Sequence, residues 1–109
     1  MKENRAIRYL SVAAKAGRLV SGLEDCGKAV RRGRGRLFIL ASDAGGNTVR
    51  QAQRLARDGR IGLIRCIYTK SELSAAVGRG SAVSAVLVTD EGLAAAFAGA
   101  HAREQEEQI

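Results

Sequence analysis

The sequence predicts an α/β protein, a three-layer α/β/α sandwich around a small mixed sheet of about four strands. Helical patterns and apolar extended segments alternate along the whole chain with short connections between them. The apolar runs at residues 37–41, 61–67 and 82–88 are typical of strands, and the first is typical of a strand covered on both faces. The length of 109 residues suits one domain.

Two helices are expected in the first third of the chain. Apolar side chains recur at helical spacing over residues 4–16, and Gly17 ends that pattern. A short extended piece follows at residues 18–20. The S-x-x-E pattern that begins at Ser21 has the form of a capping box, so it predicts a second helix that runs to about Arg32.

Further helices are expected after each long apolar run. Capping-box patterns at Thr48 and Thr69 predict two helix starts, and Asp90 is expected to cap the last helix. The chain from His101 onward shows no apolar stripe. We therefore expect residues 1–100 to form one domain and residues 101–109 to be an acidic, frayed tail.

Positive charge is concentrated in the first 60 residues. They hold fourteen Lys or Arg and five Asp or Glu, a net charge of +9, whereas residues 61–109 carry a net charge of −2. Clustered cations gain affinity for a polyanion by releasing counterions from its phosphates. Arginine outnumbers lysine fourteen to four, and its planar fork suits phosphates and base edges. The charge distribution favours a nucleic-acid partner.

The residues offer no constellation for catalysis, for a metal or for a cofactor. Cys26 and Cys66 lack metal-ligand spacing and are interpreted as reduced core thiols, and the single His101 falls in the expected tail. Asp43 follows a strand, but a lone carboxylate more commonly caps a helix or makes a turn. No apolar run has the length of a membrane span, and no signal peptide opens the chain. We expect a cytoplasmic, non-enzymatic protein without membrane contact.

The helix expected from Gly22 carries one charged face. Its members recur at i, i+4, i+7 and i+8: Glu24, Lys28, Arg31 and Arg32. The basic run continues at Arg34. An ordinary solvated face would explain the charge alone. In the alternative, amides and carboxylates at the helix start, Asp25 among them, read base edges while the cations hold phosphates.

A second basic stripe lies on the helix expected after residue 48. It comprises Arg50, Arg54 and Arg57 and is interpreted as a solvated face, with extension of an RNA surface as the less favoured interpretation. No aromatic platform interleaves with these cations, so base stacking is not indicated.

Three segments together resemble the L-seven-Ae/L-thirty-e ribosomal protein superfamily, most closely its bacterial YlxQ-like members. The segments are KAGRLVSGLEDCGKAVRRG, RLFILASDAGGNT and IRCIYTKSELSAAVGRG, in the same order and spacing over about residues 6–97. The resemblance implies an α/β/α sandwich that binds structured RNA, in many relatives a kink-turn or a similar bent internal loop.

The resemblance also implies which residues at the second helix contact RNA. In relatives, a G-[T]-N-E-x-x-K pattern at the start of this helix reads tandem G·A pairs, and Gly22, Asp25 and Lys28 match its glycine, acid and lysine. Glu24 stands where the asparagine would be, and Leu23 replaces a polar residue. A carboxylate cannot donate a hydrogen bond to a guanine acceptor.

The second contact region that the resemblance implies is the loop before the last strand, GRGSAV at residues 78–83. Arg79 would contact a phosphate there, and Ala82 and Val83 would pack against an extruded nucleotide. Asp43 lies near the same surface in relatives.

The expected function is therefore non-catalytic binding of structured RNA, kink-turn-like or ribosomal, with ribosome-associated proteins as further candidate partners. An interaction module that binds a protein through the same fold is the alternative, which the departure at Glu24 keeps open. A recognition module for a separate RNA-modifying enzyme is a third hypothesis. Binding to RNA that weakens steeply with salt would favour the first hypothesis over the second.

Overall fold

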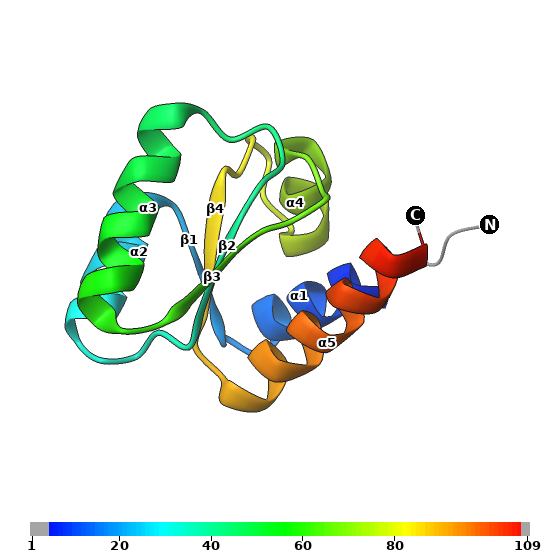
Figure 1. Cartoon of the computed structure of the whole chain (residues 1–109), viewed down its shortest axis with the longest axis horizontal. Coiled ribbons are helices and arrows are strands. Elements are labelled where there is room, and N and C mark those ends of the chain that lie inside the picture. Colours follow the sequence, from blue (N-terminus) through cyan, green and yellow to red (C-terminus); the bar gives the residue numbers. More distant parts are fainter. Residues whose placement is uncertain (1–4, 108–109) are drawn as a thin grey trace.

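The computed structural model describes residues 5–107, which fold as a four-stranded sheet with helices on both faces (Figure 1). The helices are α1 (Arg5–Lys15), α2 (Leu23–Arg31), α3 (Gly46–Gly59), α4 (Lys70–Val77) and α5 (Glu91–Glu107). The strands are β1 (Leu19–Ser21), β2 (Leu37–Leu40), β3 (Gly62–Arg65) and β4 (Ala85–Val88). The predicted α/β/α sandwich is confirmed.

The sheet is mixed and has the strand order β1-β4-β2-β3. Strands β2 and β3 pair in parallel, whereas β4 runs antiparallel to both β1 and β2. Every residue of the two central strands, β2 and β4, is buried, which explains their continuous apolar sequences. The strands are shorter than the sequence predicted. In particular, residues 82–84 belong to the loop before β4.

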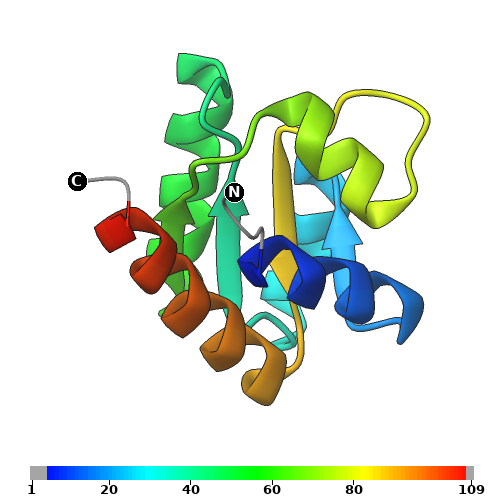
Figure 2. The same cartoon turned by 90° about the vertical axis from the view of Figure 1, so that its right-hand side faces the viewer.

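Helices α1, α4 and α5 cover one face of the sheet (Figure 2), and α2 and α3 cover the other (Figure 1). Successive side chains of a strand point to opposite faces, so β2 serves both cores. Leu37 and Ile39 pack on the α1 and α5 side, and Phe38 and Leu40 pack on the α2 and α3 side. The fold therefore places the basic α2 and α3 together on one outer layer.

Two of the predicted helix caps form and two do not. Thr69 and Glu72 make a full capping box at the start of α4, and Asp90 Oδ2 accepts from the Leu93 amide at 2.8 Å. The predicted boxes at Ser21 and Thr48 were wrong. Ser21 is held in β1 by its pairing with β4, and α3 already begins at Gly46, two residues before Thr48.

The prediction of a frayed tail from residue 101 was wrong for the residues that the structure describes there. Helix α5 continues to Glu107, and His101 and Glu104 are buried. The His101 ring stacks on Phe97, one helical turn earlier, with centroids 5.4 Å apart. Residues 108 and 109 lie outside the described residues.

Candidate nucleic-acid interface

The two predicted contact regions meet around one hollow of about 240 Å³. Strand β1 is hydrogen-bonded to β4, and the Gly22 amide donates to the Ala85 carbonyl oxygen at 3.3 Å. This pairing brings the start of α2 next to the loop that precedes β4. Residues from both regions line the hollow together with Thr48 of α3: Ser21, Gly22, Leu23, Arg79, Ser81, Ala82, Val83, Ser84 and Ala85.

Gly22 makes the turn from β1 into α2 with a φ of 90°, in the region of backbone space that favours glycine. A Cβ at this position would meet no atom within 4 Å, so the backbone conformation rather than space requires glycine. No side chain caps α2, and its first intrahelical hydrogen bond runs from the Cys26 amide to the Gly22 carbonyl oxygen. The amides of the first turn therefore have no side-chain partner.

The carboxylates of Glu24 and Asp25 are exposed in the first turn of α2, where the helix dipole favours negative charge. Glu24 lies 3.9 Å from the Lys28 ammonium group, but the two side chains are 88% and 54% exposed. An ion pair of this kind contributes little free energy. Lys28 is consequently available to an incoming phosphate.

The loop between α4 and β4 is held in place from inside the protein. The Ser74 hydroxyl shares its proton between the carbonyl oxygens of Arg79 and Ser81, at 2.7 and 2.6 Å. Sequence reasoning missed Ser74. A serine inside the apolar face of a helix was the available signal, because its hydroxyl needs a partner when buried. Ala82 is exposed, whereas Val83 is only 6% exposed and packs in the core below the hollow.

Asp43 does not line the hollow. Its Oδ1 accepts from the Lys70 amide at 2.8 Å and so helps to cap α4. A lone carboxylate was expected to cap a helix or make a turn, and Asp43 does bond to a helix start. The helix is α4, however, and not α3, which follows Asp43 directly in the chain. The same loop is fixed by Arg65, whose Nη2 donates to the Ser42 and Ala44 carbonyl oxygens at 3.1 and 3.3 Å.

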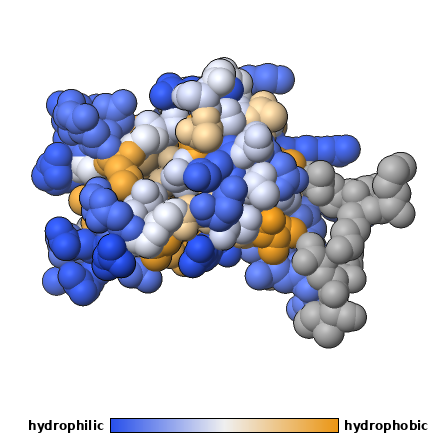
Figure 3. Space-filling model, turned by 90° about the horizontal axis from the view of Figure 1, so that it is seen from above, coloured by the Kyte–Doolittle hydropathy of each residue, from blue (hydrophilic) through white to orange (hydrophobic). Residues whose placement is uncertain are grey.

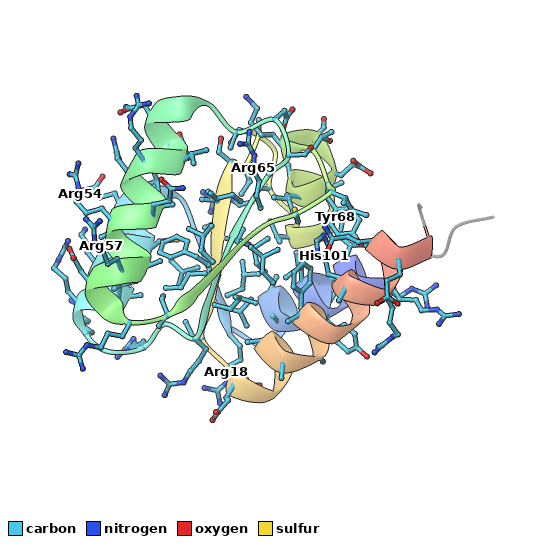
Figure 4. The ribbon with its side chains drawn as sticks, viewed as in Figure 1. Arg18, Arg54, Arg57, Arg65, Tyr68 and His101 are labelled. Atoms are coloured by element: carbon cyan, nitrogen blue, oxygen red, sulfur yellow. The ribbon has the colours of Figure 1, made fainter. Side chains whose placement is uncertain are left out.

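The remaining cations of the predicted site do not lie together. Arg31 lines a groove of about 620 Å³ between α2 and α3, and Arg54 of α3 lines the same groove. Figure 4 shows Arg54 and Arg57 pointing outward from α3, and Figure 3 shows hydrophilic side chains crowding this side of the molecule. Arg32 and Arg34 follow α2 and lie beyond its end. The candidate interface would therefore have to extend from the hollow along α2 to include these cations.

Among the described residues, no Cys, His, Asp or Glu side chain lines the hollow. The thiols of Cys26 and Cys66 are buried and not joined in a disulfide, as predicted. Burial raises the pKa of Cys26 to about 12 and that of Cys66 to about 11, so both stay protonated. Among residues 5–107 no group of three His, Cys, Asp or Glu side chains could hold a metal ion, and none of the described helices is long and apolar enough to cross a membrane.

The fold and this surface define a class: a small α/β/α protein with an uncapped helix start and a basic outer layer. Residues 5–98 match the model of the ribosomal protein L7Ae/L30e/S12e/Gadd45 family, and the chain belongs to that family. The narrower likeness to YlxQ-like members stays a prediction.

One curated protein and one solved structure are similar to this chain. The chain is 32% identical over 93 residues to the large ribosomal subunit protein eL30 of Methanocaldococcus jannaschii, a match that covers 85% of this chain and 82% of the relative. It also resembles the solved structure of a protein of unknown function from Bacillus halodurans. That likeness has a TM-score of 0.80 and 28% identity, over 89% of this chain and 96% of the other.

Proposed function

We propose that the protein binds structured RNA without altering it chemically, through the start of α2 and the loop before β4. The observation that carries this proposal is the meeting of both segments around one hollow, beside the exposed cations of α2. Membership of a ribosomal protein family supports it, as does the relative whose name places it in the large ribosomal subunit. The proposed target is ribosomal RNA or another structured RNA, and the proposed location is the cytoplasm.

Each part of the surface has a proposed role. The uncapped amides of α2 and the Asp25 carboxylate meet base edges as donors and acceptors, which is how sequence is read. Lys28 and Arg31 contact phosphates, which position the protein without reading sequence. Arg79 adds a phosphate contact across the hollow, and Ala82 offers an apolar contact to a nucleotide.

Val83 is not part of this proposal, because its side chain packs inside the core. Asp43 acts on the loop that it belongs to, through its bond to the start of α4. A bent internal loop of the kink-turn kind is the proposed target. Glu24 weakens its recognition, because a carboxylate repels nearby phosphates and cannot donate to guanine.

A titration tests the proposal with a kink-turn RNA and a straight duplex of equal length, each at two salt concentrations. The wild-type protein is expected to prefer the kink-turn. Replacement Lys28→Ala should weaken binding and lower the slope of log affinity against log salt by about one. Replacement Glu24→Asn should raise the preference for the kink-turn by about tenfold, the value of one good contact to a base edge.

Lys15→Ala is the matched control, because Lys15 is exposed on α1, on the opposite side of the sheet. Its salt slope should equal that of the wild type. Equal affinity for both RNAs would reduce the proposal to general RNA binding. Absence of binding to either RNA at low salt would refute it and favour a protein partner for the same surface.

A further inference from the structure

Four arginines gather at the end of the sheet opposite to the hollow at the start of α2. Two adjoining depressions of about 350 and 290 Å³ lie there, on either side of the loop that follows α2. Gly33 and Arg36 of this loop line both depressions. The arginines that line them are called here the distal arginine cluster: Arg18, Arg34, Arg36 and Arg60.

The loop that carries Arg34 and Arg36 is rigidly attached to the core. Gly33 adopts a φ of 73°, and the Arg34 and Arg36 amides donate to the carbonyl oxygens of Ala29 and Val88 at 3.0 and 2.9 Å. The Arg36 guanidinium group donates back to the carbonyl oxygens of its own loop. A partner that binds this loop has little ordering entropy to overcome.

Gly35 fixes the same loop against the sheet. A Cβ at this position would come within 2.9 Å of Leu87 and 3.0 Å of Ile61, so only glycine lets the backbone approach this closely. Gly59, at the end of α3, approaches Val30 in the same way, since a Cβ there would lie 2.6 Å from its Cγ1 atom. Both arginine-bearing connections therefore rest directly on the core.

The charge of the distal arginine cluster is not neutralised by the protein. All four arginines are exposed, and no carboxylate forms an ion pair with them among the described residues. Asp58 lies two residues before Arg60, in the last turn of α3, and Asp90 is engaged with the Leu93 amide. Like charges that gather without counterions favour a polyanionic partner.

A structural role for these arginines is the competing explanation. Arg18, Arg34 and Arg60 each follow the end of a helix, and the carbonyl ends of helices attract cations. That role would require cations close to the last carbonyl groups. It does not account for Arg36, which directly precedes β2. Figure 4 shows Arg18 at the lower end of the molecule.

The cluster lies apart from the hollow, at the other end of the sheet. Ala85 lines the hollow and Thr89 lines the distal depression, so the four residues of β4 separate the two by roughly 13 Å. The nine residues of α2 span a similar length, about 13 Å. Figure 1 shows the two sets of loops at opposite ends of the sheet.

We propose that the distal arginine cluster binds the phosphate backbone of a second segment of the same RNA, so that the protein bridges two segments. This inference rests on the proposed function, because the hollow holds the first segment. The groove with Arg31 and Arg54 shares Leu23 with the hollow and is lined by residues of α2 and α3. The cluster recognises phosphates and contributes no reading of base sequence.

The test compares a variant with a matched control of equal charge. The variant carries Arg18→Gln, Arg34→Gln and Arg60→Asn, since asparagine tolerates the φ of 56° at residue 60. Arg36 is left in place because its guanidinium group holds the loop. The control replaces three exposed cations of α1 and α5 by glutamine: Arg8, Lys15 and Arg103.

Affinities are measured for two RNAs that share one internal loop and differ only in stem length. The wild-type protein should bind the long-stem RNA at least about tenfold more tightly, with a salt slope larger by about two to three. The variant should bind the short-stem RNA as the wild type does and lose the gain on the long-stem RNA. The control should keep that gain.

Three outcomes would overturn the inference: no gain from the longer stem, an equal loss in variant and control, or a variant whose only defect is a lower Tm. The last outcome would assign the arginines to the helix ends. Lys28→Ala in the same titration separates this inference from the proposed function. If Lys28→Ala binds both RNAs normally while the variant loses the long-stem gain, the proposed contact at α2 fails, and phosphate binding by the distal arginine cluster stands without the bridge to the hollow.

Discussion

Replacement Glu104→Ala should destabilise the protein more than any other change to a charged residue of α5. The Glu104 side chain is 7% exposed, and its Oε1 accepts from the Ala6 amide at 2.7 Å. Its Oε2 accepts from the buried Tyr68 hydroxyl. The Ala6 amide is one of the free donors at the start of α1, so Glu104 joins three segments that are far apart in the sequence.

The magnitude follows from these two hydrogen bonds. A bond to a charged group contributes about 1.5–3 kcal/mol, and truncation also leaves two buried donors without a partner. We expect a loss of about 3–5 kcal/mol in the free energy of unfolding. For a domain of this size each kcal/mol lowers Tm by about 4–8 °C, so Tm should fall by roughly 15 °C or more.

Thermal unfolding followed by far-UV circular dichroism measures this loss. Glu106→Ala is the matched control, because Glu106 is exposed on the same helix. Its Tm should change by no more than a few degrees. Tyr68→Phe removes one of the two bonds and should give about half of the loss. Equal Tm values for Glu104→Ala and Glu106→Ala would refute the assignment of Glu104 to the core.

Three further changes probe stability by chemical denaturation. Burial lowers the pKa of His101 below 6.5, although the charge of a neighbouring carboxylate opposes this shift. The contribution of the neutral ring to the free energy of unfolding should therefore be complete above pH 6.5 and should decline as the pH falls below 6.5. His101→Gln should flatten this decline, and an unchanged pH profile would contradict the reasoning. Thr69→Ala should lower the free energy of unfolding by about 1 kcal/mol because the capping box is lost, whereas Thr48→Ala should lower it by less than about 0.5 kcal/mol. Equal losses in the two variants would contradict the assignment of the cap to Thr69. Gly35→Ala should lower the free energy of unfolding by about 1–3 kcal/mol through overpacking. Gly80→Ala should not destabilise the protein, because a Cβ at this position meets no atom within 4 Å. Equal stability of the two variants would show that the loop at Gly35 can shift.

The layers of the fold were predictable because local patterns determine them. A continuous apolar run identified β2 as a central strand, and a second such run identified β4 as a strand. Apolar side chains at helical spacing identified α1. The order of the strands was not predictable in the same way. It depends on which segments pair across the sheet, such as Ser21 with Val86, and a single sequence records no pairing.

The errors at the helix starts have one physical origin. A capping box forms only where the chain has just left an extended segment and no other interaction holds the capping residue. Thr69 meets that condition. Ser21 is held by its partner strand, and the two glycines before Asn47 let α3 begin earlier than Thr48. Pattern alone could not separate these cases.

The C-terminal part of α5 was misjudged because its buried face is made of polar residues. Phe97, His101 and Glu104 recur at i, i+4 and i+7, which is a helical stripe. A histidine and a glutamate count as surface residues until their partners are known. Those partners, Ile67 and Tyr68, come from a distant segment, and the His101 Nε2 accepts from the Ile67 amide at 3.1 Å.

The candidate site was predicted in its parts and not in its arrangement. The resemblance placed Gly22 and Ala82 in one contact surface, and both line the same hollow. It also placed Val83 there, and Val83 lines the same hollow, but only 6% of it is exposed because it packs in the core. Whether these residues contact RNA stays a prediction that the titrations above test.

The hydrogen bond between Glu104 and Ala6 holds the two ends of the described chain next to each other. The first turn of α1 and the last turns of α5 lie together, on the side away from α2 and α3 (Figure 1). A dye or an affinity handle attached beside Arg5 or Glu107 would thus stand clear of both basic surfaces. Neighbouring ends of this kind also suit circular permutation, in which the old ends are joined and new ones are opened elsewhere. Such a rearranged chain would present the same α2 and α3 layer from a different starting point.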